Sequence, residues 1–237
     1  LATIVYTSGS TGTPKGVELT HANFVFITYS GVNSMPDIAM KPNRRLLLFL
    51  PLAHVFARYM QFFCFAGNVS LGLSSNLKTI LADFKAFKPT FILAVPRIFE
   101  KIYNAASQKA GAGFKGRVFA DATQTACDWS HAQQSGGSIP LALNAKHALY
   151  NKLVYSSIME VFGGHVEYAV SGGAPLDSSI AHFFNGVGLS LLEGYGMTET
   201  CAPSSVNPTE GYKIGTIGLP LQGVTMGVDE EGELCIK

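Results

Sequence analysis

The chain has 237 residues, of which 47% are hydrophobic and only 14% are charged. This composition indicates one or two folded domains with a large buried core. Because 17 basic residues balance 16 acidic ones, for a net charge of +1, the composition argues against a nucleic-acid partner.

A loop of small residues is the first motif along the chain. Residues 3 to 16 read TIVYTSGSTGTPKG, and Thr7 to Pro14 are all Gly, Ser, Thr or Pro. The apolar run before the loop predicts a strand, and nucleotide sites of α/β sheets lie where such strands end. Backbone N–H groups, hydroxyls and the Lys15 ammonium form a set that can cradle phosphate.

Two other interpretations of this loop stay open. In the first, the loop is a solvated linker. In the second, its hydroxyls stabilise turns and do not contact phosphate. The loop does not fit the standard nucleotide motifs, because a Walker A loop needs Gly-Lys-Ser/Thr whereas Lys15 here precedes Gly16, and no GxGxxG is present.

Strand-like runs alternate with longer segments of helical period, which predicts an α/β fold with a mostly parallel sheet flanked by helices. The apolar stretch 46–67 is interrupted by Pro51 and polar residues, so we expect a strand, a turn and a helix rather than a membrane span. The last 25 or so residues, with DEEGE as a turn, predict a short β-rich antiparallel tail. The predicted strands are 3–7, 45–50, 69–73, 90–95, 166–171 and 188–192, and the clearest helices start after Pro96 and cover about 114–131 and 142–162.

The four cysteines are scattered without the CxxC spacing of a metal or redox site. We expect small core or surface residues of a protein from a reducing compartment. They are Cys64, Cys127, Cys201 and Cys235.

Four motifs follow one another in order: YTSGSTGTPKG at 6–16, SGGAPL at 171–176, EGYGMTET at 193–200 and GTIGLPLQG at 215–223. They resemble, in turn, the phosphate loop, the adenine-contact turn, the adenine and magnesium motif and the following stretch of the adenylate-forming superfamily. That superfamily includes acyl-CoA synthetases, luciferases and the adenylation domains of peptide synthetases. The resemblance covers nearly the whole chain.

The resemblance implies a division of the chain. Residues 1–40 would form the edge of a first α/β subdomain with the phosphate loop, 42–203 a second α/β subdomain, and 204–237 the start of a β-barrel subdomain. Since the chain starts at Leu1 and stops at Lys237 inside an expected strand, we expect a piece of a longer protein. The family's mobile C-terminal domain, its ribose-binding Asp and its adenylation-assisting Lys would lie beyond the last residue, so we expect this piece to be nearly inactive.

Family enzymes join a carboxylate to the α-phosphate of ATP, release pyrophosphate and pass the acyl group to a thiol. The resemblance implies catalytic roles for Lys15, His54, Thr198 and Glu199, with Glu199 as the Mg²⁺ ligand because hard carboxylate oxygens suit this cation. Tyr195 would stack on the adenine ring. The implied nucleotide-binding residues are Thr7, Ser8, Gly9, Ser10, Thr11, Gly12, Thr13, Lys15, Gly172, Gly173, Ala174, Pro175, Gly194, Tyr195, Gly196 and Thr198.

The acyl substrate is indicated by LPLAHVFAR at 50–58 and AVPRIFEKIYNAA at 94–106, which resemble long-chain fatty acyl-CoA synthetases. His54 takes the position of the family's substrate-side histidine, and the alternative is a core histidine. Many long-chain relatives have Glu where this chain has Ala57, so a role of that glutamate is not carried over. The FDxS-like motif of amino-acid-activating members is absent.

We therefore expect a fragment of a long-chain fatty acid CoA ligase that uses ATP, Mg²⁺, coenzyme A and a fatty acid. The alternatives are another adenylating enzyme, such as a fatty acyl-AMP or aryl-acid ligase, and a non-catalytic nucleotide-binding domain. A cytoplasmic protein is expected, and a fatty acid substrate suggests contact with a membrane surface, although no basic amphipathic helix is evident.

Overall fold

The computed structural model describes residues 1–9 and 12–237. Its largest sheet has seven strands in the order β4-β3-β5-β6-β7-β8-β9. Strands β4, β3, β5, β6 and β7 are parallel, and β8 and β9 join antiparallel at one side. The strands are β1 (Thr3–Thr7), β2 (Lys15–Leu19), β3 (Arg44–Leu48), β4 (Val69–Leu73), β5 (Phe91–Ala94), β6 (Tyr168–Ser171), β7 (Ser190–Met197), β8 (Ala202–Val206), β9 (Leu219–Pro220), β10 (Met226–Val228) and β11 (Leu234–Ile236).

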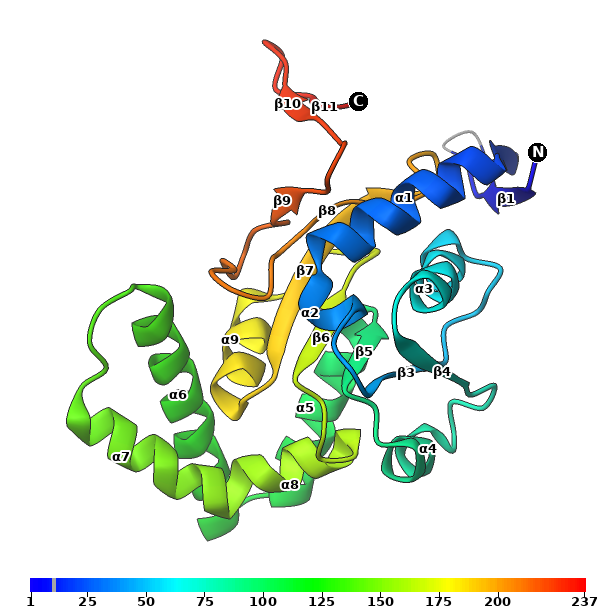
Figure 1. Cartoon of the computed structure of the whole chain (residues 1–237). Helices are drawn as coiled ribbons and strands as arrows, with labels where there is room; N and C mark the ends of the chain where they lie inside the picture. The colour runs from blue at the N-terminus through cyan, green and yellow to red at the C-terminus, as the bar shows by residue number, and fades with distance from the viewer. Residues whose placement is uncertain (10–11) are drawn as a thin grey trace.

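Helices cover both faces of this sheet (Figure 1). Alternate residues of the strands enter two cores: Leu46 and Phe91 pack with α1 and α3, whereas Leu47 and Ile92 pack with α4, α5, α6 and α9. The predicted α/β class with flanking helices is therefore confirmed. The helices are α1 (His21–Ser34), α2 (Pro36–Ala39), α3 (Val55–Ala66), α4 (Ile80–Phe87), α5 (Pro96–Ala110), α6 (Phe114–Gln134), α7 (Leu141–Tyr150), α8 (Ser156–Met159) and α9 (Ser178–Val187).

One strand prediction needs correction in its pairing. The strand 3–7 exists as β1, but it pairs antiparallel with β2 in a separate two-stranded sheet. Val5 and Leu19 of this hairpin are buried in the core that also contains α1 and α3. The hairpin therefore lies outside the parallel sheet, because the residues after the small-residue loop extend as a second strand that we had not predicted.

The helix predicted over 142–162 is one nearly continuous rod with a π-turn at Asn151–Tyr155 between α7 and α8. A 3-10 turn at Glu160–Phe162 ends it. Gly163 and Gly164 follow at φ values of 92° and 74°, which L-residues with side chains rarely adopt. The predicted stop at these glycines is thus confirmed.

The antiparallel tail is also present, as the hairpin of β10 and β11. In Figure 1 this hairpin projects away from the helices that cover the large sheet. The expected boundary between residues 203 and 204 falls inside β8, which continues the large sheet. The division into three subdomains stays a prediction. None of the described helices has the length and apolar content that a membrane span requires.

Candidate functional site

A cavity of about 430 Å³ lies at the carboxyl ends of β5 and β6. Val95 follows β5 directly, and Gly172 follows β6. Ligands of open α/β sheets bind at this edge. Apolar side chains form most of its wall, and the cavity is lined by Met35, Ile38, Leu50, Pro51, His54, Val55, Phe56, Ala57, Tyr59, Met60, Phe63, Phe91, Val95, Val170, Gly172, Gly173, Gly194, Tyr195, Gly196, Met197, Thr198, Ala202, Pro203 and Val206.

Two of the predicted motifs meet at this cavity. A side chain at Gly172 would place its Cβ 3.2 Å from the Phe56 ring and 3.5 Å from the Gly194 carbonyl oxygen. Gly173 has a φ of 83°. The positive φ of Gly173 favours glycine, and a side chain at Gly172 would fit tightly where SGGAPL approaches the start of EGYGMTET.

A tight turn between β7 and β8 presents Thr198 and Glu199. The Thr200 hydroxyl accepts the Met197 N–H at 3.0 Å, and its oxygen lies 3.0 Å from the Ala202 carbonyl oxygen. Cys201 and Ala202 both adopt positive φ, of 58° and 91°. This side-chain bridge closes the turn and leaves Glu199 exposed at its tip.

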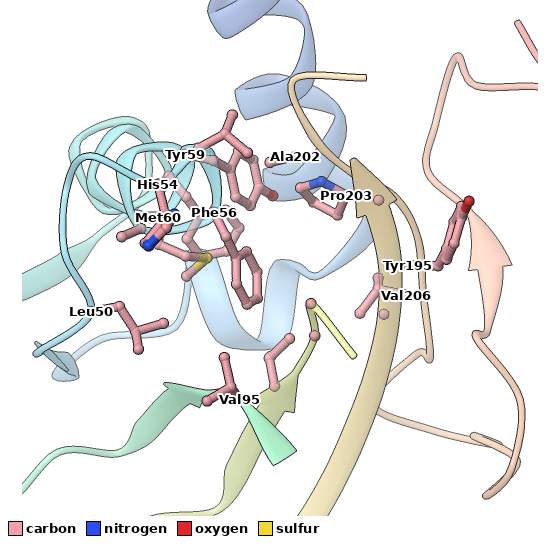
Figure 2. Close-up of a pocket in the computed structure, with 18 of the residues that line it drawn as sticks. Leu50, His54, Phe56, Tyr59, Met60, Val95, Tyr195, Ala202, Pro203 and Val206 are labelled. Atoms are coloured by element: carbon pink, nitrogen blue, oxygen red, sulfur yellow. The ribbon is translucent and has the colours of Figure 1, made fainter. Parts of the chain in front are cut away.

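Tyr195 occupies a β-bulge of β7, at the register shift between residues 195 and 196. Figure 2 shows its ring on the opposite side of β7 from Phe56 and His54. An adenine stacked on Tyr195 would therefore lie on that side of the strand.

His54 is the residue before α3, and it lines the cavity with an exposed side chain. No side-chain cap hydrogen bond ties it to the helix. Arg58 secures the turn instead, since its Nε donates to the Leu52 carbonyl oxygen at 3.1 Å. An exposed imidazole at a cavity does not fit the alternative of a satisfied core histidine.

Glu193 links the two motifs through hydrogen bonds. Its Oε1 accepts the Leu176 N–H at 3.1 Å, and its carbonyl oxygen accepts the Asn207 N–H at 2.9 Å. Burial raises the pKa of the Glu193 carboxyl, and the Leu176 N–H opposes this shift in part. Glu193 was not among the predicted site residues.

The described residues of the small-residue loop, 7–9 and 12–14, belong to the β1–β2 hairpin, and none of them lines the cavity. Gly9 and Gly12 have positive φ, and the Gly12 N–H donates to the Gly9 carbonyl at 3.2 Å. Lys15 and Thr13 are exposed, Thr7 is half-buried and Ser8 is exposed. The predicted phosphate contacts Ser10 and Thr11 lie outside the described residues.

A second hollow brings this hairpin next to the β7–β8 turn. Glu18 and Leu19 of β2 line it together with Glu199, Thr200 and Cys201. Glu199 lies here rather than on the large cavity, and none of the described residues of the small-residue loop lines this hollow. Ala174 and Pro175 are exposed and line neither hollow.

The donor set fits one kind of metal. Within residues 1–9 and 12–237, no group of three His, Cys, Asp or Glu side chains gathers to hold an ion. A single exposed carboxylate such as Glu199 suits Mg²⁺, which keeps several waters and takes its other ligands from phosphate.

Cys64 and Cys201 are buried, Cys127 is half-buried and Cys235 is exposed, all as free thiols. Burial raises the pKa of Cys64 to about 12 and that of Cys201 to about 11. Both buried thiols are therefore protonated at neutral pH and poor nucleophiles.

The apolar wall contains residues that sequence reasoning did not identify. Phe56, Tyr59 and Met60 come from α3, and Met35 and Ile38 come from the α1–α2 segment. In sequence they have the same apolar pattern as core residues, and only their arrangement around an empty volume distinguishes them.

Comparison with known proteins agrees with these motifs. The family model described as "AMP-binding enzyme" matches residues 1–237. The chain is 44% identical to the long-chain-fatty-acid–CoA ligase FadD15 of Mycobacterium bovis, over all of this chain and 39% of that protein. It is 33% identical to the long chain acyl-CoA synthetase 3 of Arabidopsis thaliana, over all of this chain and 38% of that protein. The chain thus spans about two fifths of these relatives.

Solved structures share the fold. The o-succinylbenzoate CoA synthetase of Bacillus subtilis, bound to a product analogue, matches with a TM-score of 0.66 and 21% identity over 99% of this chain and 38% of that chain. The N-terminal domain of FACL13 from Mycobacterium tuberculosis matches with a TM-score of 0.64 and 21% identity over 98% of this chain and 46% of that chain. With its ordered motifs, its fold and a family match over every residue, the chain belongs to the AMP-binding enzyme family.

Proposed function

We propose that this chain is the nucleotide- and acyl-binding part of a long-chain fatty acid CoA ligase that forms AMP. One observation carries the proposal: an apolar cavity of about 430 Å³ opens onto the glycine-rich segments at 172–173 and 194–196. Apolar pockets with a few convergent polar groups are typical of small-molecule sites. The 44% identity to a mycobacterial long-chain-fatty-acid–CoA ligase supports the same substrate class.

The reaction has two balanced steps. A carboxylate oxygen of the fatty acid bonds to the α-phosphorus of ATP while the bond to the bridging oxygen breaks and pyrophosphate leaves. The sulfur of coenzyme A then bonds to the acyl carbon, AMP leaves, and the thiol proton passes to a base.

The residues of this chain supply positioning and charge. We assign phosphate contacts to the loop that ends at Lys15, adenine contacts to Gly172, Gly173 and Tyr195, and orientation of the carboxylate to His54. Thr198 would donate to the adenylate phosphate. Glu199 would hold Mg²⁺, which neutralises phosphate charge in such reactions. A solved neighbour with this fold contains ATP and a magnesium ion, which supports this assignment.

The alternatives share this half of the machinery. The mostly apolar cavity wall suits an aryl acid as well as a fatty acid, and the 44% identity to a mycobacterial long-chain-fatty-acid–CoA ligase favours the fatty acid. A fatty acyl-AMP ligase would bind the same acyl adenylate, and release of AMP that depends on coenzyme A in the whole protein separates the two.

Isothermal titration of the 237-residue chain with a non-hydrolysable palmitoyl-AMP analogue and Mg²⁺ tests the proposal. We expect binding that weakens in Tyr195→Ala and Glu199→Ala. Tyr29→Ala and Glu230→Ala are matched controls, because both side chains are exposed and neither lines the cavity or the second hollow. Equal affinity in all variants would contradict the assignment, and no binding at all would move the test to the whole protein.

We also propose that the α7 surface contacts membranes. No residue of α7 is buried. Leu141 and Leu149 of α7 and Leu153 of the π-turn that follows it (Asn151–Tyr155) are 89%, 55% and 62% exposed. Residues spaced four and eight apart share a helix face. Lys152 is exposed beside this stripe. Basic and apolar groups together favour an anionic bilayer surface.

A further inference from the structure

The fourth motif, GTIGLPLQG at 215–223, has no role in the site described so far. None of the residues 215–223 lines the large cavity. The motif instead folds back onto the end of β8: Gly218 has a φ of 79°, and a side chain there would overlap the peptide group between Val206 and Asn207. The backbone of the motif therefore packs directly on the residue that follows β8, an approach that a side chain would block.

Asn207 fastens this loop through its side chain. It is 3% exposed. Its Nδ2 donates to the Thr216 carbonyl oxygen at 2.6 Å, and its Oδ1 accepts the Lys213 N–H at 3.0 Å. Because loss of either bond would leave a buried polar group unpaired, the amide holds residues 213–218 in one place.

The same residue holds the strand that carries Tyr195. The Asn207 N–H donates to the Glu193 carbonyl oxygen at 2.9 Å, and Asn207 Nδ2 lies 3.3 Å from the same oxygen. The Glu193 side chain accepts the Leu176 N–H at 3.1 Å. Glu193 and Asn207 together therefore connect the SGGAPL, EGYGMTET and GTIGLPLQG segments.

The fourth motif covers the face of the sheet on which Tyr195 lies. Tyr195 pairs with Ser205 of β8, and residues directly opposite each other in an antiparallel pair share a face. The Ser205 hydroxyl donates to the Ile217 carbonyl oxygen at 2.9 Å. Figure 2 shows the Tyr195 ring on the side of β7 away from Phe56. The loop that Asn207 fastens is thus next to the proposed adenine side of β7.

We propose that Asn207 is a positioning residue for the nucleotide: it fastens residues 213–218 to the start of β7 and so holds Tyr195 where adenine binds. The inference rests on the proposed function, which assigns adenine contacts to Tyr195, Gly172 and Gly173. Asn207 does not line the cavity, so it acts through the strand. Its loss should weaken binding of the adenine end of a ligand and leave the contribution of the acyl end unchanged.

Isothermal titration of the 237-residue chain with AMP and with the palmitoyl-AMP analogue tests the inference. We expect Asn207→Ala to lower the affinity for both probes by the same factor, about tenfold, which corresponds to the effect of one hydrogen bond. An equal factor places the loss at the nucleotide end that the two probes share, whereas a disturbed acyl wall would cost the palmitoyl-AMP analogue more.

Tyr155→Phe is the matched control for lost stability. Tyr155 is 0% exposed, its hydroxyl donates to the Ala122 carbonyl oxygen at 2.7 Å, and it does not line the cavity. Both variants should lower the melting temperature, because each removes buried hydrogen bonding. Only Asn207→Ala should lower the affinity for AMP.

Hydrogen–deuterium exchange of the ligand-free chain gives a readout that does not depend on the proposed function. In Asn207→Ala the amides of 193–197 and 213–218 should exchange faster than in the wild-type chain, and by a larger factor than the amides of α6. In Tyr155→Phe these two segments should change no more than the rest of the sheet.

The outcomes separate the inference from the proposed function. If the wild-type chain binds AMP and Asn207→Ala binds it equally well, or if the palmitoyl-AMP analogue loses much more affinity than AMP, the inference fails and the nucleotide site stands. Unchanged exchange at 193–197 in Asn207→Ala would also overturn it. If the wild-type chain binds neither probe although exchange at 193–197 rises in Asn207→Ala, the proposed nucleotide site is wrong, and the inference fails with it.

Discussion

The Leu176 N–H donates a hydrogen bond to Glu193 Oε1 over 3.1 Å, and this bond ties the glycine turn after β6 to the strand that carries Tyr195. The two residues are 17 positions apart in the chain. The acceptor is the half-buried Glu193 carboxylate, whose pKa is raised by burial. The relative position of the two segments of the proposed nucleotide site therefore depends on the partly desolvated Glu193 carboxylate.

Replacing Glu193 with Gln should stabilise the chain at pH 7. Burial raises the folded-state pKa of Glu193 above its value in the unfolded chain. Its contribution to stability is therefore fully present below the unfolded-state pKa and is lost as the pH rises through the folded-state pKa. Gln keeps an oxygen for the Leu176 N–H without the charge. Urea unfolding at pH 7 and pH 4 measures the effect: the midpoint should rise at pH 7, with little change at pH 4. Glu230→Gln, on an exposed turn, should show no such difference.

Gly196→Ala should disrupt the turn that presents Thr198 and Glu199. A Cβ at this position would overlap the Ala202 carbonyl oxygen and lie 2.6 Å from its carbon. Overpacking of this kind costs roughly 1–3 kcal/mol. Thermal unfolding should show the loss, and the palmitoyl-AMP analogue should bind more weakly. Gly227→Ala is the control, since its Cβ would meet no atom within 4 Å and should leave stability nearly unchanged.

His54→Gln should separate a functional role from a structural one. The side chain is exposed and makes no cap bond, so the free energy of unfolding should stay within about 0.5 kcal/mol of wild type. Adenylation by the whole protein should fall roughly 100-fold, the lower end of what a positioned acid or base contributes. Stability measurements on the chain and pyrophosphate release from the whole protein provide the two readouts. A destabilised variant would instead show that the imidazole serves the fold.

Membrane contact through α7 should depend on its apolar stripe. Leu149→Ser with Leu153→Ser should reduce sedimentation with phosphatidylserine-containing vesicles, and added salt should weaken the remaining binding because Lys152 contributes by charge. Leu73→Ser with Leu77→Ser is the control, since these side chains are 65% and 63% exposed on another part of the molecule. Equal losses in both pairs would contradict a specific role of α7.

The isolated chain should turn over ATP and palmitate very slowly or not at all. It spans about two fifths of the length of its long-chain relatives, so we expect the groups for both reaction steps to be divided between this chain and the rest of such a protein. A pyrophosphate-release assay measures this. Robust turnover would show that residues 1–237 hold a complete active site.

The α/β class, most strands and helices and the family follow from patterns within the sequence. Local signals carry this information: apolar runs such as 45–50, the glycine stop at 163–164 and the order of the motifs depend on neighbours in the chain. The strand at Lys15–Leu19, which pairs with strand 3–7, was not predicted. Strand pairing is a contact between two segments, and the sequence of the loop that joins these two did not indicate it.

Packing between segments distant in the chain sets which apolar residues line a cavity and which fill the core. Tyr59 and Phe63 lie one turn apart on α3 and look alike in sequence, yet the unpaired hydroxyl of Tyr59 is evident only when α1, α3 and β8 are packed together. The same packing placed Glu193 opposite Leu176. Burial and hydrogen-bond satisfaction arise from segments distant in the chain, and no local pattern specifies them.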